Sequence, residues 1–186
     1  MRIGLLVLSC YFALAASASS SLALQLGDPF PLYKLTDLQD AQHPLGGPSR
    51  SIHLIHLFGA GSDACQRAAP RLEADFHKRY AERGLKVVGV EVWTGERGDA
   101  ESFRDFTQVT YPILMGGVAL GQDCGLAYNS FILVDSEGTV RYISEGPEST
   151  AYDASALGLS VETHLQEVST VDLRTWGFIK ELYDRR

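Results

Sequence analysis

Residues 52–92, IHLIHLFGAGSDACQRAAPRLEADFHKRYAERGLKVVGVEV, decide the fold. The near-continuous apolar run over 52–58 is typical of a strand that is buried on both faces of a parallel sheet. The small residues 59–61 end this strand, and Ser62 and Asp63 are residue types that cap helix N-termini. We therefore expect a buried strand that leads directly into a helix.

The predicted helix covers residues 64–83 and is followed by a second strand. Its apolar side chains recur every four positions, as on one face of a helix, and they are Ala68, Leu72, Phe76 and Tyr80. Gly84 is the residue type that most often ends a helix, and the valine-rich segment 85–93 favours a strand. The order of strand, helix and strand indicates a parallel crossover unit.

The remaining segments extend this unit at both ends. Residues 34–38 favour a short strand, whereas residues 41–50 are rich in proline and glycine and predict a loop. Farther along the chain we expect helices over 99–108 and 118–124, a hairpin of strands 131–135 and 139–144, and a helical pattern over 155–183.

The first 18 residues have the pattern of a secretory signal peptide. Arg2 supplies the positive charge, residues 3–16 are largely apolar, and Ala16-Ser17-Ala18 is a small-x-small cleavage site. The apolar run is shorter than the ~20 residues that a membrane-spanning helix needs. We therefore predict an exported protein (periplasmic, in the cell envelope or secreted) with no membrane span after cleavage. A lipoprotein signal ending at Cys10 is the alternative.

The composition is that of an acidic globular protein. Hydrophobic residues make up 45% of the chain and charged residues 21%, and the formal net charge is −7. This charge, without a clustered basic patch, argues against nucleic acid and anionic membranes as partners. Cys10 leaves with the signal peptide, so Cys65 and Cys124 remain, which are too few for a disulfide-stapled scaffold.

The chain resembles the thioredoxin superfamily, and most closely its exported redoxin branch of thiol-disulfide oxidoreductases, with the peroxiredoxins as near relatives. The matching features are a buried strand, a small-residue turn, a cysteine at a helix start, Pro70 five residues later and the strand GLKVVGV. Residues 121–144, GQDCGLAYNSFILVDSEGTVRYIS, resemble the closing helix, loop and hairpin of this family. The resemblance spans residues 25–168 and implies an α/β thioredoxin-like fold, with a central mixed sheet flanked by helices. Residues 169–186 would then form a C-terminal helical extension.

The active-site motif departs from the family pattern. The Cys-x-x-Cys of the oxidoreductases stands here as Ser62-Asp63-Ala64-Cys65, so only the second cysteine is kept. Ser62 and Cys65 resemble the Thr-x-x-Cys of peroxiredoxins, but the peroxiredoxin proline falls at Phe58, and the peroxiredoxin arginine and thioredoxin cis-proline fall at Asn129. The resemblance implies a thiol oxidoreductase or a peroxiredoxin-like antioxidant protein with one active-site cysteine. Its substrate would be a thiol or disulfide protein partner, or a peroxide.

Five residues are candidates for the site. Cys65 is the candidate nucleophile, because the free N–H groups and the dipole of a helix start favour a thiolate; the alternative is a small buried cysteine that only packs in the core. Ser62 either caps the helix or hydrogen-bonds the thiolate or a peroxide oxygen, and His56 either exchanges the thiol proton or is a core histidine. Cys124 is a possible resolving thiol, and Asn129 lies on the loop that faces the site in this family.

No metal or other cofactor is expected. His53 and His56 lie three residues apart on one strand and point to opposite faces, and no other His or Cys spacing suggests ligands.

Two alternatives to a redox enzyme stay open at this point. One is a redox-inactive thioredoxin-fold module that binds a partner protein or peptide. The other is a structural disulfide between Cys65 and Cys124, which would make both cysteines inert and requires their Cα atoms to lie within ~7 Å.

Overall fold

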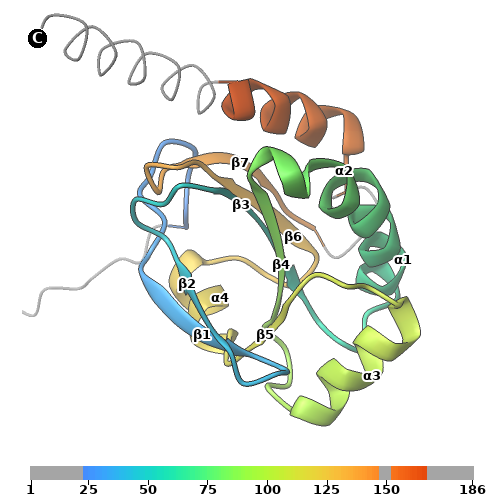
Figure 1. The fold of residues 1–186 in the computed structure, drawn as a ribbon. Coiled ribbons are helices and arrows are strands. Elements are labelled where there is room, and N and C mark those ends of the chain that lie inside the picture. Colours follow the sequence, from blue (N-terminus) through green and yellow to red (C-terminus); the bar gives the residue numbers. More distant parts are fainter. Residues whose placement is uncertain (1–22, 147–151, 167–186) are drawn as a thin grey trace, which may run out of the picture.

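The computed structural model describes residues 23–146 and 152–166, whose strands form one sheet in the order β2-β1-β5-β4-β3-β6-β7 (Figure 1). The strands are β1 (Tyr33–Asp37), β2 (Gln42–Leu45), β3 (Ile52–Phe58), β4 (Leu85–Glu91), β5 (Ile113–Met115), β6 (Ser130–Val134) and β7 (Val140–Ser144). β3, β4 and β5 pair in parallel, and all other neighbouring strands pair antiparallel. The predicted central mixed sheet is confirmed.

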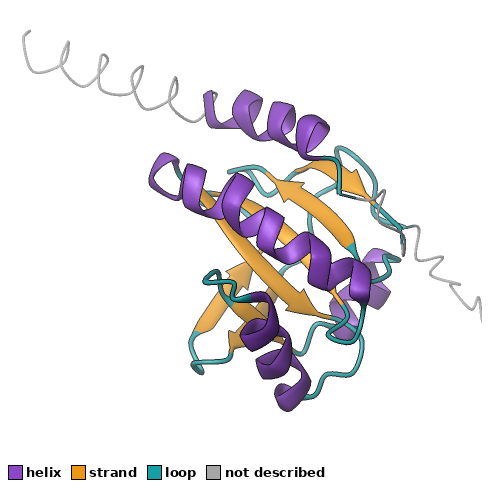
Figure 2. Ribbon diagram, turned by 90° about the vertical axis from the view of Figure 1, so that its right-hand side faces the viewer, coloured by secondary structure: helices purple, strands orange, loops and turns teal. Residues whose placement is uncertain are grey.

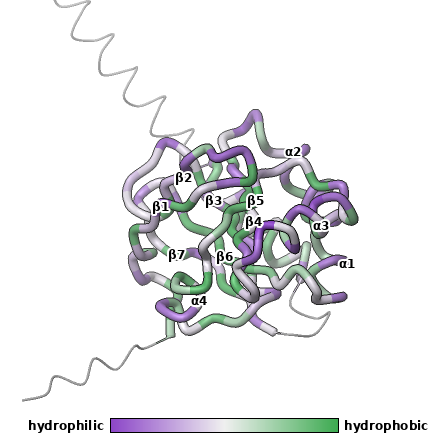
Figure 3. Tube along the Cα trace, turned by 90° about the horizontal axis from the view of Figure 1, so that it is seen from below, coloured by the Kyte–Doolittle hydropathy of each residue, from purple (hydrophilic) through white to green (hydrophobic). Residues whose placement is uncertain are grey.

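Two apolar clusters cover the two faces of this sheet. Side chains of β3 alternate between them, with Leu54 and Phe58 in the first cluster and Ile55 and Leu57 in the second. The first cluster is covered by α1 (Asp63–Leu72), α3 (Arg97–Thr107) and a helix described over 154–166, and the second by α4 (Val118–Cys124) and the β1–β2 hairpin. Figure 2 shows α1 lying across the strands, and Figure 3 shows apolar residues concentrated along the central strands.

The predicted helix over residues 64–83 is confirmed, but it is not uniformly α-helical. α1 continues through a π-helical turn (Glu73–His77), α2 (Lys78–Tyr80) and a 3-10 turn (Ala81–Arg83). Gly84 ends it with a φ of +95°, in the left-handed region that favours glycine. The π-turn coincides with the buried carboxylate of Glu73, which accepts hydrogen bonds from the backbone N–H and hydroxyl of Thr110 (2.9 and 2.6 Å).

The prediction of a loop over residues 41–50 is wrong in its first part, where β2 forms. β2 is an antiparallel partner of β1, with Leu45 opposite Tyr33 and Gln42 opposite Thr36. Pro44 has no N–H to donate, but β2 is the edge strand of the sheet, where a proline does not interrupt a ladder. Pairing with β1 therefore overrides the local turn-forming tendency of this segment.

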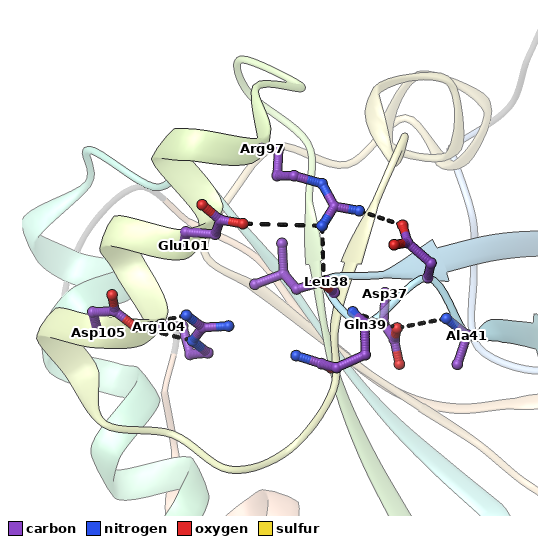
Figure 4. Close-up of polar contacts among 9 residues, drawn as sticks. Asp37, Leu38, Gln39, Ala41, Arg97, Glu101, Arg104 and Asp105 are labelled. Carbon is purple, nitrogen blue, oxygen red and sulfur yellow. Dashed lines mark hydrogen bonds and ion pairs between the residues drawn. The ribbon is translucent and has the colours of Figure 1, made fainter.

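The tip of the β1–β2 hairpin is tied to α3 by a small polar network (Figure 4). The Asp37 carboxylate accepts a hydrogen bond from the backbone N–H of Ala41 (2.9 Å) and so closes the turn. From the first turn of α3, the Arg97 guanidinium donates to the carbonyl of Leu38 (2.9 Å) and pairs with the Asp40 carboxylate. The hairpin is thereby attached to the helix that packs beside the start of α1.

Parts of the predicted domain organisation lie outside the described residues. The signal peptide (1–18) and the C-terminal extension (169–186) both do, and the boundaries of the 25–168 domain stay predictions. The helices that the structure describes include none that is long and apolar enough to cross a membrane.

Candidate active site

Cys65 stands in the first turn of α1, just after β3 ends and the chain turns through residues 59–61. The Ser62 side chain accepts a hydrogen bond from the Cys65 backbone N–H (3.4 Å), so Ser62 is the N-cap of α1. The sequence-based helix start and its cap are therefore confirmed. The Cys65 side chain, however, is 0% exposed, as the alternative of a buried, packing cysteine expects.

The environment of Cys65 favours the neutral thiol. Burial raises the pKa of the Cys65 thiol, because a thiolate would lose its hydration there. The Ser62 hydroxyl and the backbone at Gly59 and Asn129 hydrogen-bond at this site and lower the pKa, but they do not outweigh burial. In this structure, where the Cys65 side chain is sealed from solvent, Cys65 is a protonated thiol at neutral pH.

Asn129 lies directly before β6, beside the start of α1. Its φ of +62° is left-handed, its N–H donates to the carbonyl of Leu57 (2.7 Å), and its side-chain amide donates to the carbonyl of Gly146 (2.8 Å). The described residues contain no cis peptide bond, so the backbone here differs from the cis-proline of thioredoxins. Asn129 occupies the predicted loop and contributes to the hollow described next.

A hollow of about 370 Å³ opens beside the start of α1. Ala64 and Ala68, which flank Cys65 along the helix, line it together with Asn129. Arg67 and Arg71 contribute the positive charge, and none of the described residues that line the hollow is a carboxylate. The Arg71 guanidinium lies 4.5 Å from the ring centroid of Tyr152, another lining residue, and neither arginine forms an ion pair with a described residue.

His56 does not have the surroundings of a proton carrier. It is 0% exposed, its ring stacks on Phe131 (centroids 4.6 Å apart), and neither ring nitrogen has a hydrogen-bond partner among the described residues. Burial lowers the pKa of His56 to about 3, so its neutral ring is a weak base at physiological pH. These surroundings favour the alternative of a core histidine over the predicted proton-transfer role.

The fold does not place Cys124 near Cys65. It ends α4 and belongs to the second apolar cluster, whereas Cys65 belongs to the first, so the sheet separates the two sulfurs. Both are free cysteines, and burial raises the pKa of Cys124 to about 11. The predicted resolving disulfide and the alternative of a structural disulfide between these residues are therefore absent from this arrangement.

The loop that follows β4 borders the turn before α1. The Glu91 carboxylate is buried at the end of β4 and accepts hydrogen bonds from the N–H groups of Trp93 (3.0 Å) and Gly95 (2.7 Å). This loop holds the Trp93 ring against Gly59, where an added Cβ would lie 2.4 Å from a ring carbon, and stacks it on Tyr128 (centroids 5.1 Å apart). The Trp93 side chain is 51% exposed, so the site has an aromatic border.

Comparisons with known proteins agree with this arrangement. The thiol-disulfide oxidoreductase ResA of Geobacillus kaustophilus is 26% identical over 153 residues, which cover 78% of this chain and 79% of that protein. A putative protein disulfide isomerase from Bacteroides thetaiotaomicron superposes with a TM-score of 0.67 at 15% identity, covering 77% of this chain and 91% of the other. A putative thiol:disulfide interchange protein DsbE from Chlorobium tepidum superposes with a TM-score of 0.66 at 20% identity, covering 77% and 99%.

The solved structures confirm the thioredoxin-like fold that the sequence resemblance implies. The Redoxin family matches residues 25–158, a span that contains the whole sheet, α1 and every candidate site residue. The chain therefore belongs to the redoxin family.

Proposed function

We propose that this chain is an exported thiol oxidoreductase in which Cys65 is the single reacting sulfur and a disulfide-bearing protein is the substrate. The position of Cys65 carries the proposal, since it lies in the first turn of α1 between Ala64 and Ala68, which line an open hollow. The free N–H groups and partial positive charge of a helix start stabilise a thiolate there. The export part of the proposal rests on the signal-like residues 1–18.

The proposed reaction is thiol–disulfide exchange. The Cys65 thiolate attacks one sulfur of the partner disulfide, a new S–S bond forms, and the other partner sulfur leaves as a thiolate. Since Cys124 lies across the sheet, an external thiol, from a partner protein or a small thiol reductant, attacks the mixed disulfide. That step breaks the S–S bond to Cys65, releases Cys65 as a thiolate, and forms one new S–S bond between the partner and the attacking thiol.

Exchange requires that the sulfur become accessible. Cys65 is sealed in the closed arrangement, and Asn129 lies against it at the rim of the hollow. Movement of this loop away from α1 would admit water and the partner, and it would remove the desolvation that raises the pKa of Cys65.

Removing the sulfur is the direct test of this function. The full chain should accelerate the exchange of a disulfide-linked peptide with a thiol reductant, and Cys65→Ser should abolish the acceleration. Cys124→Ser is the matched control and should retain it, because Cys124 lies on the other face of the sheet. Mass spectrometry of the peptide over time measures the exchange rate. A Cys65→Ser variant that exchanges as fast as the unaltered chain would contradict the proposal.

The charge of the hollow predicts the charge of the partner. Arg67 and Arg71 favour a partner with carboxylates near its disulfide, since guanidinium groups bind carboxylates in a bidentate manner. We expect the double variant Arg67→Glu, Arg71→Glu to slow exchange with an acidic peptide about tenfold and to speed exchange with a basic one. Arg104→Glu, a charge reversal on α3, is the control. Equal effects on both peptides would contradict this partner class.

A second candidate function is a redox-inactive module that binds a partner at the same hollow. The observation that favours it is the complete burial of Cys65, together with its raised thiol pKa. Such a module would bind an acidic peptide through Arg67 and Arg71 and would do so equally well in Cys65→Ser. Peptide binding without any exchange activity in the unaltered chain would favour this candidate.

A further inference from the structure

A second cavity lies at the opposite end of the parallel strands from Cys65. Its volume is about 440 Å³. Its walls are formed by β2 and the turn after it, by the first residues of β3 and β4, and by the last part of the helical segment 63–83. Cys65 follows the last residue of β3, whereas this cavity includes His53 near the first. The cavity is therefore separate from the candidate active site.

The cavity exists because β5 is short. β5 pairs with β4 only at Gly89 and Val90, so residues 85–88 of β4 have β3 on one side and no strand on the other. The Gly89 N–H donates to the carbonyl of Pro112 (2.9 Å), and alternate residues of a strand point their backbone groups the same way. The backbone of Val87 is thus directed at this open edge, and Pro112, having no N–H, cannot extend the ladder.

The lining of the cavity combines apolar side chains with hydrogen-bond donors, namely one lysine and three histidines. Pro44, Leu45, Leu85, Val87 and Val88 are among the apolar residues of the lining.

Four of the described lining side chains are histidines or lysine, and none of the described lining residues is a carboxylate, although the whole chain has a net charge of −7. Lys86 forms no ion pair with a described residue. The Nδ1 atom of His77 is buried and has no hydrogen-bond partner in the described part of the chain. His43 is already engaged through its Nε2 with the Asp37 carboxylate (2.6 Å).

Lys86 supplies the positive charge of the cavity at physiological pH. Burial, with smaller contributions from the positive charges of Lys86 and His43, lowers the pKa of His53 to about 4, so the His53 ring is neutral there. An anion would be attracted by the Lys86 ammonium, and the imidazole rings would offer neutral hydrogen-bonding groups. Among the described residues, no group of three His, Cys, Asp or Glu side chains is arranged to hold a metal ion, so the cluster is not a metal site there.

We propose that this cavity binds a small organic anion with an apolar body, of the class of medium-chain carboxylates. The carboxylate would lie near Lys86 and the histidines, and the apolar body would cover the side chains of Pro44 and Leu45. The volume falls within the ~300–1,000 Å³ of small-molecule sites. Binding there is independent of the chemistry of Cys65.

Calorimetric titration of the full chain with octanoate, with octanol as the neutral counterpart, tests this site. Octanoate should bind saturably and about tenfold more tightly than octanol, which corresponds to about 1.4 kcal/mol of charge recognition. Lys86→Glu should weaken octanoate about tenfold or more, Arg104→Glu should not, and Cys65→Ser should bind like the unaltered chain. Amide chemical-shift changes should cluster at residues 85–88.

Three results would overturn the proposal. They are the absence of saturable octanoate binding, equal affinity for octanol and octanoate, and unchanged affinity in Lys86→Glu. Ala81→Trp, at the rim of the cavity, gives a second independent variant, because a bulky ring there should block entry without removing a charge. Loss of octanoate binding with retained exchange at Cys65 would also separate this site from the proposed function.

Discussion

Ser62→Cys is expected to convert the chain into a two-cysteine oxidoreductase. Ser62 caps α1 with its side chain directed at the Cys65 backbone, so a sulfur at position 62 would lie beside Cys65 at the helix start. Under mild oxidation the two sulfurs should form a disulfide, and mass spectrometry should show the loss of two hydrogen atoms. The variant should also exchange disulfides at least about tenfold faster than the unaltered chain, because a second thiol resolves the mixed disulfide within the site.

Ser62→Ala is the matched control for this experiment. It removes the capping oxygen and should lower the free energy of unfolding by about 1 kcal/mol, without any gain in exchange. Reduced Ser62→Cys should be destabilised by a similar amount, which separates the loss of the cap from the new chemistry. If the sulfurs at positions 62 and 65 of Ser62→Cys both remain free thiols under mild oxidation in native conditions, the site does not have the geometry that the proposed function requires.

His56→Leu is expected to weaken the decrease of the free energy of unfolding that occurs as the pH falls below 6.5. The folded chain binds a proton at His56 more weakly than the unfolded chain does, since burial lowers the pKa of His56 from 6.5 to about 3. The stability that depends on neutral His56 is therefore complete above pH 6.5 and is lost as the pH falls toward 3. The loss amounts to about 1.4 kcal/mol per pH unit at most, so it is on the order of 2–3 kcal/mol at pH 4.5.

Urea unfolding of both proteins at pH 7.5, 5.5 and 4.5 measures this effect. The carboxylates with lowered pKa, such as Asp37 and Glu73, are common to both proteins and cancel in the difference. His53→Leu should also weaken the loss of stability at acid pH. Its effect should stop growing near pH 4, because the pKa of His53 is lowered only to about 4. A His56→Leu profile parallel to that of the unaltered chain would contradict the description of His56 as a buried neutral ring.

The parts of the fold that local chemistry determines could be predicted from the sequence. The apolar run of β3, the cap at Ser62 and the stop at Gly84 each depend on residues within a few positions, and all three are confirmed. β2 was missed because its Pro44 and the glycines that follow favour a turn, and only pairing with the distant partner β1 makes a strand of it.

The site was harder to predict for a related reason. Cys65 is buried in a cluster that draws on distant parts of the chain, and Asn129, which hydrogen-bonds at Cys65, comes from a loop 64 residues later in the sequence. His56 was placed correctly on its strand, but stacking on Phe131 rather than contact with a sulfur determines its chemistry. The carboxylate of Glu91, at the end of β4, is buried because it accepts hydrogen bonds from the N–H groups of the loop that follows it, which the residue type alone does not show.

The central claim is that Cys65, and no other sulfur, undergoes disulfide exchange in the native protein. Incubation with oxidised glutathione, followed by peptide mapping, tests it most directly, since glutathione also carries the carboxylates that Arg67 and Arg71 favour. The account predicts a mixed disulfide on the Cys65 peptide, formed slowly because the site must open, and none on the Cys124 peptide. An adduct on Cys65 that appears only after the protein is unfolded would contradict it.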